Sequence, residues 1–123
     1  MIEMWFFKSK PKPAIIKQKN YYFANNSNYN DKFQLNENEL KFFDILSERT
    51  IGWNKGIFRL ERMGDGTISV WLPEGFVGKI RLCKKKHWMM ILKNLYDNEI
   101  VEGTVDDFIK NIDAWIRYCK KYL

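Results

Sequence analysis

Positive charge is concentrated in two blocks of the chain, and each block lies beside aromatic residues. Residues 8–19 contain five lysines and no acid, and residues 79–93 contain six cationic residues and no acid. The remainder is balanced or slightly acidic, and the formal net charge is +6. Clustered cations beside aromatic rings are typical of surfaces that bind a polyanion, because the cations pair with phosphates and the rings can stack on bases.

The second basic block is the strongest candidate for a binding site, because its lysines directly precede an apolar segment. Four apolar residues in that segment follow helical spacing, so we expect a helix over residues 86–96. Cations at a helix N-terminus oppose the helix dipole, and a bound phosphate would remove this conflict. The interpretation is a phosphate-binding corner made by Lys79, Arg81, Lys84, Lys85, Lys86 and His87. The alternative is a solvated lysine run that protects a sheet edge.

The first basic block leads into an aromatic triplet, Tyr21, Tyr22 and Phe23. Basic residues followed by rings are typical of surfaces that bind single-stranded nucleic acid. We therefore expect Lys17 and Lys19 to extend the contact made by the second block, which requires both blocks to share one face of the fold. The alternative places these rings in the core, since alternate residues of a strand face opposite sides.

The sequence contains no recognisable catalytic, cofactor or metal motif. The single histidine, His87, follows Cys83 by four residues, but zinc sites pair their ligands at closer and repeated spacings. We therefore predict a protein that is not an enzyme and holds no cofactor or metal. A divalent-metal nuclease is kept as an alternative on an acidic group formed by Glu99, Glu102, Asp106 and Asp107. Asp106 and Asp107 are the second and third residues after Thr104, where they also fit the start of a helix.

The elements that must position these residues are a series of strands and helices. Strands are expected at 14–23, 57–63, 67–72 and 79–83, and helices at 36–48, at 86–96 and from residue 104 to near the C-terminus. Asn36 with Glu39, and Thr104 with Asp107, have the spacing of capping boxes. This order predicts the α+β class: an antiparallel meander of about three to five strands with about three helices, packed mainly on one face.

The apolar faces of these elements predict the core and a one-domain organisation. We expect one domain over residues 1–123, with a flexible basic segment at 8–13 and a loop at 24–34. Pro11 and Pro13 exclude a helix in the basic segment. The residues expected in the core are Phe43, Leu46, Phe58, Leu60, Val70, Ile91, Leu95, Phe108, Ile112 and Ile116.

Together these features predict a small protein that binds nucleic acid or a nucleoprotein. Contacts should be mainly to phosphates of DNA or RNA, because lysine is poorly suited to bidentate recognition of bases. No apolar run approaches the roughly 20 residues of a membrane span. The abundance of Lys, Asn and Ile suits an AT-rich genome, so we expect a cytoplasmic protein of a bacterium or of a phage in its host cell.

The rival hypothesis is an inhibitor that acts by binding protein. A phage or mobile element could use such a protein against a host nuclease or defence complex, an anti-CRISPR-like function. Its partner would then be a nucleic-acid-processing protein complex, and exposed aromatic residues would carry the binding energy. The candidates for this role are Trp5, Tyr29, Trp53, Trp71 and Trp115.

Overall fold

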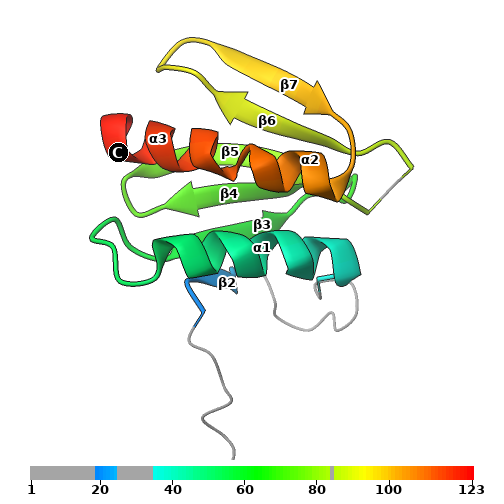
Figure 1. Cartoon of the computed structure of the whole chain (residues 1–123), viewed down its shortest axis with the longest axis horizontal. Coiled ribbons are helices and arrows are strands. Elements are labelled where there is room, and N and C mark those ends of the chain that lie inside the picture. Colours follow the sequence, from blue (N-terminus) through cyan, green and yellow to red (C-terminus); the bar gives the residue numbers. More distant parts are fainter. Residues whose placement is uncertain (1–18, 25–34, 84) are drawn as a thin grey trace, which may run out of the picture.

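A six-stranded sheet with its helices on one face forms the fold (Figure 1). The computed structural model describes residues 19–24, 35–83 and 85–123. Its strands are β2 (Tyr21–Phe23), β3 (Phe58–Arg62), β4 (Ile68–Leu72), β5 (Gly75–Arg81), β6 (Trp88–Leu92) and β7 (Asn98–Glu102). Its helices are α1 (Glu37–Thr50), α2 (Val105–Lys110) and α3 (Ile112–Tyr122). The mixed α+β class predicted from the sequence is confirmed.

The strands lie in the sheet in the same order as in the chain. Within the described residues, β2 runs parallel to β3 and every later neighbour is antiparallel. A parallel pair needs a long crossover, which contains α1, whereas antiparallel pairs need only short turns. The turn between β3 and β4 was predicted. The Asp65 carboxylate accepts a hydrogen bond from the Thr67 N–H at 3.0 Å, and Gly66 has a φ of 91°, which glycine adopts without strain.

The core lies between the sheet and the helices. Alternate residues of the inner strands point to this side, and Leu60, Val70 and Ile80 are fully buried there. On the helix side, the ring of Trp115 meets the ring of Phe42 edge to face, with centroids 5.4 Å apart. The expected core residues that are buried are Phe43, Leu46, Phe58, Leu60, Val70, Ile91, Phe108 and Ile112.

Both predicted capping boxes are present. The Asn36 side chain accepts a hydrogen bond from the Glu39 N–H at 2.8 Å, and the Glu39 carboxylate accepts one from the Asn36 N–H at 2.9 Å. Thr104 and Asp107 form the same reciprocal pair at the start of α2. The expected last helix is divided at Asn111, which has a φ of −94° and a ψ of 3°. Its side-chain amide donates to the Asp107 carbonyl oxygen at 2.9 Å, so it competes with the helical hydrogen bonds at this point.

The helix predicted over residues 86–96 is wrong, because these residues form β6 and the turn that follows it. β6 is an inner strand with apolar residues on both faces, so its sequence lacks the alternation that would mark a strand. The turn is set by Asn94, whose side-chain oxygen accepts from the N–H groups of Tyr96 and Asp97 at 2.8 and 3.0 Å. Leu95 lies in this turn with 62% of its surface exposed, so it is not a core residue.

Several smaller expectations also differ from the structure. The sheet has six strands in the described residues, more than expected, because β6 replaces the predicted helix and β7 follows it as a further strand. Of the strand expected at 14–23, residues 21–23 are strand and residues 14–18 lie outside the described part. The segment 8–13 and residues 25–34 of the expected loop also lie outside it. Ile116 is half-buried, whereas its neighbour Trp115 is fully buried.

Gly78 is required by the close approach of α3 to the sheet. The Trp115 indole N–H donates to the Met90 carbonyl oxygen at 2.8 Å, and this brings the indole across β5. A Cβ at position 78 would lie 2.9 Å from the indole and 2.8 Å from that same carbonyl oxygen. No real Cβ tolerates such distances, so any larger residue must displace α3.

We therefore expect Gly78→Ala to lower the free energy of unfolding by about 1–3 kcal/mol. The matched control is Gly64→Ala, since a Cβ at position 64 would have no atom within 4 Å. The control should stay within about 0.5 kcal/mol of the wild type. Urea denaturation followed by circular dichroism measures both, and equal stabilities of the two variants would contradict the packing described here.

Candidate nucleic-acid interface

The second face of the sheet is not covered by any helix of the described residues (Figure 1). Successive residues of a strand point to opposite faces of the sheet. Leu60, Val70 and Ile80 point into the core, so the residues next to each of them in the chain face this second side. We call this side the open face. Its principal residues are Tyr22, Arg59, Trp71, Phe76, Lys79, Arg81, Trp88, Met90 and Ile100. It thus combines cationic and aromatic side chains with the carboxylates of Glu61 and Glu102, which pair with Arg59 and Lys86.

Two arginine–tryptophan pairs lie at opposite ends of the open face. Arg59 lies opposite Trp71 across β3 and β4, with its guanidinium carbon 5.4 Å from the ring centroid. Arg81 lies opposite Trp88 across β5 and β6. Lys79 stands between the two pairs on β5, two residues before Arg81. A line from Trp71 through Lys79 to Trp88 therefore alternates ring, cation and ring.

A pocket of about 370 Å³ opens beside the first of these pairs. The Trp71 ring is held in place by Phe76, with centroids 5.0 Å apart, and by its indole N–H, which donates to the Ser69 hydroxyl at 3.2 Å. The Arg59 Nε lies 3.2 Å from a carboxylate oxygen of Glu61. The pocket is lined by Tyr22, Ile57, Arg59, Trp71, Leu72, Pro73 and Gly75. A fixed ring beside a cation suits a flat ligand that carries negative charge.

The loop between β5 and β6 holds Lys84, Lys85, Lys86 and His87 of the second basic block, whereas Lys93 follows β6 and pairs with Glu99 on the helix side. Lys85 and Lys86 are exposed, His87 is half-buried, and Lys84 lies outside the described residues. The Lys86 ammonium lies 3.3 Å from a carboxylate oxygen of Glu102, and both side chains are well exposed. Since strand β6 follows this loop, the predicted helix N-terminus does not exist, so a helix dipole cannot support phosphate binding here. Lys79 and Arg81 instead project from the open face.

The two basic blocks do not form a common face at Lys19. Its ammonium donates to the Asp44 carboxylate of α1 at 2.8 Å and to the Tyr21 hydroxyl at 3.3 Å. The hydrogen bond to Asp44 is the main reason why the pKa of Lys19 is raised. These contacts place the Lys19 side chain on the helix side, opposite to Lys79 and Arg81, so the expected single track is wrong for this residue. Lys17 lies outside the described residues.

The acidic residues considered for metal binding are dispersed. Glu99 and Glu102 lie on opposite faces of β7, and Asp106 pairs with Lys41 at 2.9 Å. Burial raises the pKa of the Cys119 thiol to about 12, which disfavours the thiolate that binds metals. Across residues 19–24, 35–83 and 85–123, no group of three or more His, Cys, Asp or Glu residues is placed to hold a metal ion.

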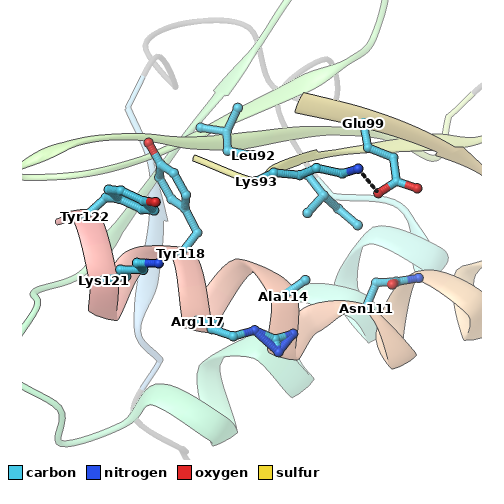
Figure 2. Close-up of a pocket in the computed structure, with 10 residues that line it drawn as sticks. Leu92, Lys93, Glu99, Asn111, Ala114, Arg117, Tyr118, Lys121 and Tyr122 are labelled. Carbon is cyan, nitrogen blue, oxygen red and sulfur yellow. Dashed lines mark ion pairs between the residues drawn. The ribbon is translucent and has the colours of Figure 1, made fainter. Parts of the chain in front are cut away.

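A second pocket, of about 340 Å³, lies on the helix side between α3 and the β6–β7 hairpin. Figure 2 shows Lys93 and Glu99 on the sheet side of this pocket and Tyr118 and Tyr122 on the α3 side. Lys93 and Glu99 form an ion pair with 3.7 Å between the charged atoms. The tyrosine rings pack on each other with centroids 5.0 Å apart. This pocket contains none of the residues predicted to bind nucleic acid.

The prediction from sequence missed Arg59 and Trp88 as parts of the site and gave Trp71 a different role. The places of Arg59 and Trp71 on the open face could have been predicted from the two strands that flank the Gly64-Asp65-Gly66 turn. Both residues occupy positions that alternate with the core residues of their strand. The place of Trp88 could not be predicted in this way, since its segment was assigned to a helix. Of the aromatic residues expected to be exposed, Trp115 is fully buried.

Comparison with protein-family models, curated proteins and solved structures finds no match to this chain. The described residues contain no helix that is both long enough and apolar enough to cross a bilayer. The class of this protein is therefore defined by its own architecture. It is a mixed α+β protein whose sheet packs on helices with one face and presents cations and aromatic rings on the other.

Proposed function

We propose that this protein binds single-stranded nucleic acid on the open face and acts in the cytoplasm without catalysing a reaction. The observation that supports this most directly is the arrangement of two arginine–tryptophan pairs around Lys79. Each indole offers a surface on which one base can stack, and each cation offers a partner for a phosphate. The alternation of rings and cations matches the alternation of bases and phosphates along a strand.

The spacing of the two tryptophans favours a single strand over a duplex. Trp71 and Trp88 lie two strands apart, which corresponds to about 10 Å across the sheet, and they are also offset along the strands. An unpaired strand can cross the sheet and place separate bases on the two rings. In a duplex the bases are already stacked on one another, so their flat faces cannot reach these side chains.

The loop between β5 and β6 extends the contact beyond Trp88. Lys85 is exposed, and the exposed ion pair of Lys86 with Glu102 contributes little stability, so its ammonium can turn to a phosphate. These contacts read the backbone and not the base, so recognition should depend weakly on sequence. Lys19 is not part of this surface because it binds Asp44.

The experiment is the salt dependence of binding to a labelled oligonucleotide of random sequence. Phosphate contacts release counterions, so the logarithm of affinity falls with the logarithm of salt by roughly 0.7 for each phosphate contact of a single strand. The double variant Lys79→Gln with Arg81→Gln should reduce that slope by about 1.4 and weaken binding to all sequences alike. A duplex of the same length should bind more weakly than the single strand.

The matched control removes the same charge from the helix side. Lys110 and Lys120 are both exposed there, on α2 and α3. The double variant Lys110→Gln with Lys120→Gln should leave the slope unchanged, because these cations are remote from the open face. If both double variants change the slope equally, the attraction is a property of net charge and the open face is not the site.

The second candidate is the inhibitor that binds a nucleic-acid-processing protein complex. The observation in its favour is the exposure of Leu95 and Tyr96, at 62% and 91%, on the β6–β7 hairpin. Such side chains on a surface often mark contacts with protein. This candidate becomes the preferred one if the purified protein binds neither single-stranded DNA nor single-stranded RNA at low salt.

A further inference from the structure

The exposed edge of the sheet at β7 has the geometry of an interface between two copies of this chain. β7 is the last strand on its side of the sheet in the described residues. It contains no proline, no lysine and no bulge, which are three of the devices that prevent an edge strand from pairing with another chain, and its charged residues are Glu99 and Glu102. It also carries Ile100, half of whose surface is exposed.

The backbone groups that β7 offers can be identified from its hairpin. The Lys93 N–H donates to the Asp97 carbonyl oxygen at 2.9 Å, so this pair is hydrogen-bonded. Hydrogen-bonded and non-hydrogen-bonded pairs alternate along an antiparallel ladder. The N–H and C=O groups of Glu99 and Val101 therefore point to β6, and those of the residues between and beside them point outward. The outward set is Asn98, Ile100 and Glu102.

We propose that β7 pairs with β7 of a second copy in an antiparallel, two-fold symmetric arrangement centred on Ile100. In this register Ile100 lies opposite the partner's Ile100, Asn98 lies opposite the partner's Glu102, and Glu99 lies opposite the partner's Val101. All the outward backbone groups of the three residues then find partners. A symmetric pair of this kind is a closed assembly, which limits it to two copies.

Charge and the number of paired residues together select this register over its neighbours. Centring the pair on Glu99 would place two carboxylates directly opposite each other, which is unfavourable across a ladder. Centring it on Val101 would place Glu102 opposite the partner's Ile100 and leave Asn98 beyond the paired region. The proposed register places each carboxylate opposite a neutral residue and uses all three outward positions.

The same arrangement accounts for the most exposed apolar side chains of the described residues. These are Leu95 and Tyr96, at 62% and 91% exposure, in the turn before β7. Because the strands run antiparallel, this turn lies beside the partner's residues 103–105, where β7 leads into α2. The half-buried Val105 offers apolar surface there.

The two-fold axis is perpendicular to the sheet, so the two open faces lie on the same side and become one continuous surface. The pairing itself does not depend on the proposed function.

Substitution of Asn98 tests both the pairing and its register. Asn98 is exposed, so neither charged replacement should alter the fold of a single copy. Asn98→Glu places a carboxylate opposite the partner's Glu102 twice in each dimer and should raise the dissociation constant by roughly twofold to thirtyfold. Asn98→Lys places an ammonium there and should lower the dissociation constant by a similar factor. Sedimentation velocity over a concentration series up to about 1 mM measures all three proteins.

A second variant tests the backbone contacts independently of charge. The N–H of Ile100 points outward, so Ile100→Pro removes a hydrogen bond to the partner without removing one to β6. It should give a monomer whose thermal midpoint at low concentration is close to that of Ile100→Val, which should remain dimeric. The proposal is overturned if the wild type is monomeric throughout the series, or if Asn98→Glu and Asn98→Lys change the dissociation constant in the same direction.

Discussion

Replacing Trp71 and Trp88 together by alanine will weaken binding to a single-stranded oligonucleotide by roughly 30-fold or more at fixed salt. Each ring that stacks on a base contributes about 1–3 kcal/mol, and the two rings lie on separate strands where they serve different bases. The effect should be nearly the same at all salt concentrations, because stacking releases no counterions. Fluorescence anisotropy of a labelled oligonucleotide measures the affinity.

The control for this prediction preserves the rings. Trp71→Phe with Trp88→Phe keeps an aromatic surface at both positions and should recover most of the lost affinity. Both tryptophans lie outside the buried core, so all four substitutions should leave the fold intact, and circular dichroism verifies this. Wild-type affinity in the double alanine variant would show that the open face does not stack bases, and the proposed function would fail with it.

Replacing Glu39 by alanine will cost about 3–5 kcal/mol of stability, because it removes the carboxylate from a buried ion pair with Arg62. The carboxylate is almost fully buried, and its two oxygens accept from the Arg62 guanidinium at 2.6 and 3.0 Å. One of these oxygens also accepts from the Asn36 N–H, so a single side chain caps α1 and ties it to β3. Urea denaturation measures the loss.

Two controls separate burial from charge. Asp113→Ala breaks the exposed pair with Arg49, whose atoms are 3.3 Å apart, and should cost less than about 1 kcal/mol. Glu39→Leu combined with Arg62→Met replaces both buried charges by apolar groups, and it should be more stable than Glu39→Ala alone. A loss below 1 kcal/mol in Glu39→Ala would mean that this pair does not hold α1 on the sheet.

Local chemistry made several elements predictable from the sequence. Asn36 with Glu39 and Thr104 with Asp107 mark helix starts because the partners in each capping box are only three residues apart. The glycines around Asp65 mark a turn because their conformational freedom is a property of the residue itself. The α+β class follows from the succession of such signals. The basic residues Lys79 and Arg81 were also found, since a cluster of charge is visible in the composition alone.

Long-range pairing determined what the sequence could not. The segment that begins at Trp88 is apolar on both faces, so its local pattern fits a helix as well as a strand, and only pairing with β5 and β7 decides between them. That pairing removed the expected helix N-terminus and placed Trp88 opposite Arg81. It could not be predicted from spacing along the chain.

The sequence by itself determined which residues are charged, which are aromatic and where the helices are capped. The tertiary structure decided which of them share a surface. Lys19 was assigned to the binding surface by its neighbours in the chain, yet Asp44, 25 residues away, holds it on the helix side. Arg59 and Trp71 meet because β3 and β4 pair in one register, and a shift of that register by one residue would turn one of them away. Since side chains alternate across a strand, the composition of a sheet face is fixed only when every strand has found its partner.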